Sequence, residues 1–182
     1  MNVTVAAYLG LGSNVGVREG NLRATLSALD RDQAICVDRD AGIASLYETS
    51  PVGGPAGQSS YLNTVVRVRT DLAPGDLLAR LLLVEQALGR QRCERWGPRV
   101  IDIDLLLYGD VVCASPELSL PHPHLHRRRF VLEPLAEIAS DLVHPVVGKT
   151  IRELAAALQD DAEQIIRRVA GRDWLNEDVL VA

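Results

Sequence analysis

The chain has 182 residues, a net charge of −5 at pH 7 and 47% hydrophobic residues, which predicts a globular protein with a core of its own. The acidic balance argues against a protein drawn to nucleic acid or anionic membranes by its overall field. The first residues lack the features of a signal peptide, and no apolar run reaches the roughly 18 residues that span a bilayer. We therefore expect a cytoplasmic protein without nucleic-acid or membrane partners, and we expect a monomer. Three widely spaced cysteines indicate neither a disulfide framework nor a cysteine zinc site.

Apolar periodicity divides the chain into alternating strands and helices. Strands are predicted at 3–11, within 35–47, at 61–69 and at 100–107, and helices around 22–29, 74–88, 130–138 and 151–158. Turn residues fill 12–16, 49–60 and 121–126, and residues 108–110 turn the fourth strand into a short hairpin. The order β-α-β-β-α-β predicts an α+β fold of the ferredoxin-like type with extra helices. We expect residues 1–160 to form the domain and residues 161–182 to form an acidic, less regular C-terminal tail without an assigned role.

Two acids stand two residues apart in the fourth predicted strand, at Asp102 and Asp104. Residues i and i+2 of a strand point to the same face, so the two carboxylates project together, with Cα atoms about 7 Å apart. A divalent cation relieves their repulsion, and hard oxygen ligands suit Mg²⁺. The alternative is a solvated strand face with incidental acids. The apolar neighbours on both sides argue against it, because burying two bare carboxylates is costly.

An arginine-rich loop, residues 90–99, comes directly before this strand. Guanidinium groups match phosphate oxygens in pairs, and Trp96 offers a flat face to an aromatic ligand. A solvated basic loop is the alternative. The position next to two predicted magnesium ligands favours a nucleotide site. The four arginines should repel one another without a bound anion, so we predict that this loop is a lid that closes over phosphates.

Three other motifs fit known sites less well. The glycines at 10, 12 and 16 have the spacing G-x-G-x-x-x-G, which differs from the dinucleotide fingerprint and favours a tight turn. The Gly148-Lys149-Thr150 sequence lacks the first glycine of a P-loop. The alternating histidines of residues 121–126 permit zinc binding, although prolines interrupt the run and no cysteine lies near.

Five segments carry a resemblance to a known family. They are GLGSNVG (10–16), YETSPVGG (47–54), YLNTVV (61–66), ERWGPRVIDIDLLLYG (94–109) and LPHPHLHRRRFVLEPLAEIAS (120–140). In this order they resemble the 6-hydroxymethyl-7,8-dihydropterin pyrophosphokinase family of folate biosynthesis. The block RWGPR-x-x-D-x-D is the most specific part of the resemblance.

The resemblance implies a reaction and the residues that perform it. The expected reaction transfers diphosphate from ATP to the hydroxymethyl group of the pterin, giving AMP and the pterin diphosphate. Asp102 and Asp104 would hold two Mg²⁺ ions that bridge the ATP phosphates. The implied catalytic residues of the closing loop are Arg90, Arg92, Trp96 and Arg99.

The resemblance also implies two sets of substrate contacts. Pterin contacts are expected from Thr49, Ser50, Val52, Tyr61, Asn63 and Phe130. ATP contacts are expected from Glu85, His122 and Arg128. Phe130 would stack on the pterin opposite Tyr61, although it could instead be a core side chain. Two other functions remain open from the residues alone: a non-catalytic nucleotide-binding module of the same fold, and a dinucleotide-dependent oxidoreductase, which the glycine spacing disfavours.

Overall fold

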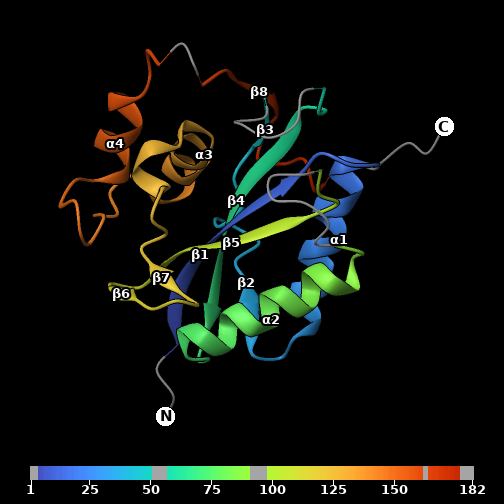
Figure 1. Ribbon diagram of the computed structural model, residues 1–182, viewed down its shortest axis with the longest axis horizontal. Helices are drawn as coiled ribbons and strands as arrows, with labels where there is room; N and C mark the ends of the chain where they lie inside the picture. Colours follow the sequence, from blue (N-terminus) through green and yellow to red (C-terminus); the bar gives the residue numbers. More distant parts are fainter. Residues whose placement is uncertain (1–3, 51–56, 91–97, 162–163, 177–182) are drawn as a thin grey trace.

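The computed structural model describes residues 4–50, 57–90, 98–161 and 164–176 (Figure 1). In chain order the elements are β1 (Val5–Ser13), α1 (Arg18–Arg31), β2 (Ile35–Val37), β3 (Leu46–Thr49), β4 (Tyr61–Thr70), α2 (Pro74–Ala87), β5 (Asp102–Tyr108), β6 (Cys113–Ala114), β7 (Ser119–Leu120), the 3₁₀ helix η1 (Leu125–Arg127), α3 (Arg129–Ala139), α4 (Ile151–Ala157) and β8 (Ile166–Ala170). Within these ranges, no helix combines the length and the apolar character that a membrane crossing requires.

One antiparallel sheet organises the molecule. Its strand order is β5-β1-β4-β3-β8, and β2 pairs with the far end of β4. The two long central strands, β1 and β4, pair over nine positions, from Val5 opposite Thr70 to Ser13 opposite Leu62. The short strands β6 and β7 form a separate hairpin after β5. β1 lies between the long strands β4 and β5, so it forms the centre of the sheet against which the other elements pack.

Helices cover both faces of this sheet (Figure 1). The odd positions Ala7, Leu9 and Leu11 of β1 pack in one core with leucines of α1 and α2. Tyr8 faces the other way and packs with residues of α3 and α4 in a second core. The period-2 alternation of a strand thus separates the molecule into two apolar layers with the sheet between them. The predicted α+β class is confirmed.

The second predicted strand, within residues 35–47, is in fact two strands. β2 and β3 both pair with β4, and a turn at residues 38–42 separates them. Asp38 holds this turn: its side chain accepts a hydrogen bond from Ala41 N at 3.2 Å and contacts Arg67 Nη2 at 2.6 Å. The turn therefore depends on Arg67 of β4, and the local sequence around residues 38–42 does not reveal this distant partner.

The first predicted strand and turn also shift. β1 continues through Ser13, so Gly10 and Gly12 belong to the strand and only Gly16, with φ of 67°, takes a turn conformation that favours glycine. The predicted helices occur near their expected bounds, and so does the hairpin after β5.

The expectation of an irregular C-terminal tail is wrong for residues 166–170. β8 pairs antiparallel with β3, from Leu46 opposite Ala170 to Thr49 opposite Ile166. Beyond it, Trp174 is 1% exposed, joins the core between the sheet and α1, and donates its indole N–H to Ala44 O at 3.0 Å. The described part of this segment, residues 164–176, therefore completes the sheet.

Replacing Trp174 with alanine tests this contribution. Truncating a buried tryptophan removes apolar area and leaves a cavity, so we expect Trp174→Ala to lower the free energy of unfolding by about 3–5 kcal/mol. Val169→Ala is the matched control, because Val169 lies on β8 but is 43% exposed, and a change within about 0.5 kcal/mol is expected there. Urea unfolding measures both. Equal, small losses would show that residues 164–176 add nothing to the core.

Candidate active site

Strand β5 places the two acids of the site over glycines of β1. Asp102 lies opposite Gly12, and Asp104 lies opposite Gly10. A Cβ atom at position 12 would come within 2.9 Å of the side-chain oxygen of Asn63. At Gly12 the backbone of β1 therefore approaches Asn63 of β4 more closely than any larger residue would allow. Asp102 and Asp104 both line the same cavity, as their spacing predicted.

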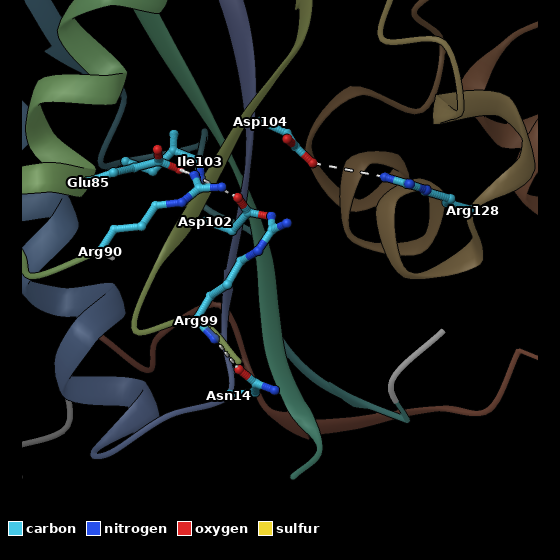
Figure 2. A network of polar contacts seen from close by, with 8 residues as sticks. All are labelled: Asn14, Glu85, Arg90, Arg99, Asp102, Ile103, Asp104 and Arg128. Carbon is cyan, nitrogen blue, oxygen red and sulfur yellow. Dashed lines mark hydrogen bonds and ion pairs between the residues drawn. The ribbon is translucent and has the colours of Figure 1, made fainter. Parts of the chain in front are cut away.

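The two carboxylates have unequal surroundings (Figure 2). Asp102 Oδ1 lies 2.9 Å from Arg90 Nη1, and its other oxygen accepts a hydrogen bond from Arg99. The ion-pair partner described for Asp104 is Arg128, at 4.0 Å. Burial and the neighbouring charge of Asp102 raise the pKa of Asp104 to about 6. The site thus holds one compensated and one poorly compensated carboxylate.

Glu85 on α2 connects the helix layer to this pair. It is 1% exposed, and its carboxylate accepts hydrogen bonds from Ile103 N at 2.7 Å and from Arg90 (Figure 2). Burial raises the pKa of Glu85. These contacts hold Arg90 beside Asp102 and attach β5 to α2. Glu85 does not occur among the described lining residues of either hollow of the site, so its expected contact with ATP stays a prediction.

Asn14 holds Arg99 from the other side, and sequence reasoning did not single it out. Its Oδ1 accepts from Arg99 N at 2.7 Å, and its own N donates to Arg99 O at 3.1 Å. Its amide nitrogen also reaches Ser59 O at 3.4 Å. The one signal in the sequence was an asparagine directly after the glycine-rich end of a predicted strand; its burial, which obliges the amide to find partners, is visible only in the structure.

The cavity beside the acids has a volume of about 530 Å³. Its described lining includes five of the six predicted pterin residues, namely Thr49, Ser50, Tyr61, Asn63 and Phe130. The sixth, Val52, lies outside the described residues. Asn63 Nδ2 donates to Thr49 Oγ1 at 2.8 Å, which fixes the orientation of the amide. Arg128 lies over the Phe130 ring at 5.7 Å and links this cavity to Asp104.

A second hollow of about 420 Å³ lies on the other side of the acids. Both hollows are lined by Arg99, Asp102, Asp104 and His122. Leu78 and Leu82 of α2 and Leu118 give the second hollow an apolar side. The acids therefore form a shared wall, so a group bound in one hollow lies next to a group bound in the other.

His122 lies on this shared wall in a neutral form. Burial and the nearby Arg128 charge lower the pKa of His122 to about 4. Its Nδ1 accepts a hydrogen bond from His124 N at 3.2 Å, which leaves Nε2 as the hydrogen-bearing nitrogen. His122 is thus suited to donate a hydrogen bond at neutral pH.

The described residues fit a metal only when a ligand completes the coordination. Within the described ranges, no group of three or more histidine, cysteine or acidic side chains could hold a metal ion. The zinc alternative for the histidine run therefore has no support there. Two carboxylates supply part of a coordination sphere, and Mg²⁺ commonly takes its remaining ligands from phosphates and water. The predicted loop residues Arg92 and Trp96, and with them most of the proposed lid, lie outside the described residues.

Paired carboxylates lie between two hollows, with arginines on each side. Such groups can bind metal ions and phosphate oxygens, as an enzyme that transfers phosphate groups requires. Residues 8–140 match the model of the family described as 7,8-dihydro-6-hydroxymethylpterin-pyrophosphokinase. A Synechocystis protein named 2-amino-4-hydroxy-6-hydroxymethyldihydropteridine pyrophosphokinase is 44% identical over 148 residues, covering 81% of this chain and 73% of its own. A Methylorubrum extorquens protein of the same name is 45% identical over 152 residues, covering 84% of this chain and 92% of its own. The chain therefore belongs to this family and is a pyrophosphokinase.

A solved structure supports the fold. The crystal structure of Plasmodium falciparum HPPK-DHPS, wild type with pteroate, superimposes with a TM-score of 0.67 at 17% identity. The match covers 90% of this chain but 44% of the Plasmodium chain. This chain thus spans less than half the length of that protein, and the likeness concerns the fold alone.

The unequal carboxylates predict opposite effects of two similar substitutions. A carboxylate whose pKa is raised in the folded state destabilises the fold as pH rises through about 4 to 6. Asp104→Asn should therefore be more stable than the wild type at pH 7.5, and this advantage should shrink at pH 4. Asp102→Asn should lose about 1–3 kcal/mol at pH 7.5, because a neutral amide with one acceptor oxygen replaces the charged carboxylate that Arg90 and Arg99 share.

Urea unfolding at pH 4 and pH 7.5 without metal measures both variants. The pair serves as its own control, since each change removes one negative charge from the same strand face. A loss of stability in both variants at pH 7.5 would contradict the described difference between the two acids.

Proposed function

We propose that this chain transfers diphosphate from ATP to the hydroxymethyl group of 6-hydroxymethyl-7,8-dihydropterin, giving AMP and the pterin diphosphate in folate biosynthesis. The observation that carries the proposal is the shared wall of Asp102 and Asp104 between two hollows. An acceptor hydroxyl in one hollow and a triphosphate in the other would meet at this wall. Such transfers depend mainly on positioning and charge neutralisation.

The larger cavity is the proposed pterin site. Phe130 and Tyr61 supply aromatic faces, and Asn63 supplies an amide with a donor and an acceptor edge. The hydrogen bond from Asn63 to Thr49 holds that amide in place before any ligand binds. A preformed orientation lowers the entropy that binding must overcome.

The second hollow is the proposed nucleotide site. His122, Arg90 and Arg99 line it next to the acids, and leucines of α2 give it an apolar side for a base. Two Mg²⁺ ions held by Asp102 and Asp104 would neutralise the phosphates and lower the pKa of the attacking hydroxyl. The arginines beside Asp102, together with Arg128, Arg92 and Trp96, would then bind the phosphates and exclude water.

Apart from Asp104, which the proposal assigns to metal binding, no described residue of the shared wall is a strong general base. His122 lies at the wall, but with a pKa of about 4 it is a weak proton acceptor. We infer that His122 instead donates a hydrogen bond to a phosphate oxygen, and that the hydroxyl gives its proton to solvent water, because the cations around the hydroxyl would lower its pKa.

The finer architecture belongs to the same proposal. The order β5-β1-β4-β3 with antiparallel pairing, and α1 and α2 on one face, supports a ferredoxin-like topology. We assign the reaction to residues 1–160, and we propose a cytoplasmic monomer.

Release of AMP tests the proposal directly. The wild type should form AMP from ATP and Mg²⁺ only when the hydroxymethyl pterin is present, which a non-catalytic nucleotide-binding module would not do. Asp102→Ala and Asp104→Ala should each reduce turnover by roughly three decades, because they remove several kcal/mol of transition-state stabilisation. Asp141→Ala is the matched control, since this acid is 81% exposed and pairs with Arg152 on the surface. Near-normal turnover in either site variant at saturating Mg²⁺ would overturn the metal assignment.

A further inference from the structure

The C-terminal residues 164–176 contact β3, one of the two strands that carry the proposed pterin site. β8 pairs along the whole of β3, and its first residue, Ile166, lies opposite Thr49. Thr49 is the last residue of β3 and lines the larger cavity. The family model matches residues 8–140, so this segment lies beyond the part of the chain that defines the family.

Trp174 and two arginines anchor the segment. Arg23 of α1 lies over the Trp174 ring at 5.4 Å and donates to Leu175 O at 2.9 Å. Arg172 donates to Ile43 O at 3.0 Å and to Ala41 O at 2.7 Å. The segment is thus attached to α1 and to the residues that lead into β3, and β8 has a fixed position against the sheet.

A chain of ion pairs then runs from β8 to the beginning of β4. Arg167 of β8 contacts Glu48 Oε2 at 2.7 Å, and Arg18 contacts Glu48 Oε1 at 3.0 Å. Arg18 also donates to Ser60 O at 2.8 Å. Glu48 precedes Thr49 and Ser60 precedes Tyr61, so the chain joins the two backbone positions next to two residues of the cavity wall. Hydrogen bonds from Arg167 and Arg18 lower the pKa of Glu48, so the link stays charged at neutral pH.

We propose that residues 164–176 are a positioning element for the pterin side of the site, acting through the Arg167–Glu48–Arg18 link on Thr49 and Tyr61. The proposal rests on the proposed function, which assigns the larger cavity to the pterin. The nucleotide hollow lies on the other side of Asp102 and Asp104, and none of the linked residues occurs in its described lining. Breaking the Arg167–Glu48–Arg18 link should therefore weaken pterin binding and leave ATP binding unchanged.

Because Arg167 is exposed, its effect on the position of the strands can be tested apart from any effect on the stability of the fold. Arg167 is 72% exposed in its ion pair, and exposed pairs contribute little to folding. Removing its side chain should leave the chain folded. What changes is the freedom of the ends of β3 and β4, and the cavity wall depends on both.

The kinetic test compares Arg167→Ala and Arg18→Ala with Arg152→Ala. Arg152 is a matched control, because it is 67% exposed and pairs with Asp141 on α4's side of the molecule. The KM for the pterin should rise about two- to fivefold in Arg167→Ala, the range of an exposed ion pair, and more in Arg18→Ala, which also loses the Ser60 contact. The KM for ATP should stay unchanged, and Arg167→Lys should recover most of the effect. The double variant should fall short of the product of the two single effects, because both arginines act through Glu48.

A second measurement does not depend on activity. Hydrogen exchange of the ligand-free chain should accelerate at residues 46–49 and 61–62 in Arg167→Ala and stay unchanged at 102–108. Unchanged exchange at β3 and β4 would overturn the positioning role whatever the kinetics, and so would equal rises in both KM values. If the wild type forms no pterin-dependent AMP, the proposed function fails, and hydrogen exchange still decides whether the link holds the two strands.

Discussion

The burial of Asp104 beside the charge of Asp102 is the constraint around which the site is built. Two like charges separated by about 7 Å, the Cα spacing of residues i and i+2 in a strand, would repel by roughly 2 kcal/mol at an effective dielectric constant of about 20, and burial adds to this cost. The fold offsets this for Asp102 with Arg90 and Arg99, whereas Asp104 has Arg128 at 4.0 Å and a raised pKa. A site that leaves one carboxylate so poorly compensated gains most from a bound cation. The same uncompensated charge has two effects: removing it from Asp104 would stabilise the fold, whereas metal binding requires it.

The sheet makes this arrangement possible through its alternating faces. Ile103 and Leu105 of β5 pack in the core with α1 and α2, whereas Asp102 and Asp104 line the cavities. Gly12, opposite Asp102, lets β1 approach Asn63 closely, and Glu85 attaches the acid-bearing strand to α2 through Ile103 N. In the first half of β5, the face of Ile103 and Leu105 thus supports the core, and the face of Asp102 and Asp104 carries the chemistry.

The sequence was sufficient wherever a feature depends on local spacing. The i, i+2 rule placed both acids on one face, and apolar spacing located four helices and most strands. It was insufficient where a feature depends on distant partners. The break between β2 and β3 needs Arg67 of β4, and Trp174 finds its acceptor 130 residues away at Ala44. β8 reads as a charged, irregular segment because only its pairing with β3 makes it a strand. The internal contacts of Glu85 and Asn14 likewise follow from the packing of separate elements.

Metal stoichiometry tests the central claim most directly. If the two carboxylates supply only part of the metal coordination and phosphates complete it, Mn²⁺ should bind weakly to the free chain when followed by electron paramagnetic resonance. With a non-hydrolysable ATP analogue present, two ions per chain should bind tightly, and Asp104→Asn should lose at least one of them. Tight binding without the nucleotide, or unchanged stoichiometry in Asp104→Asn, would contradict the account.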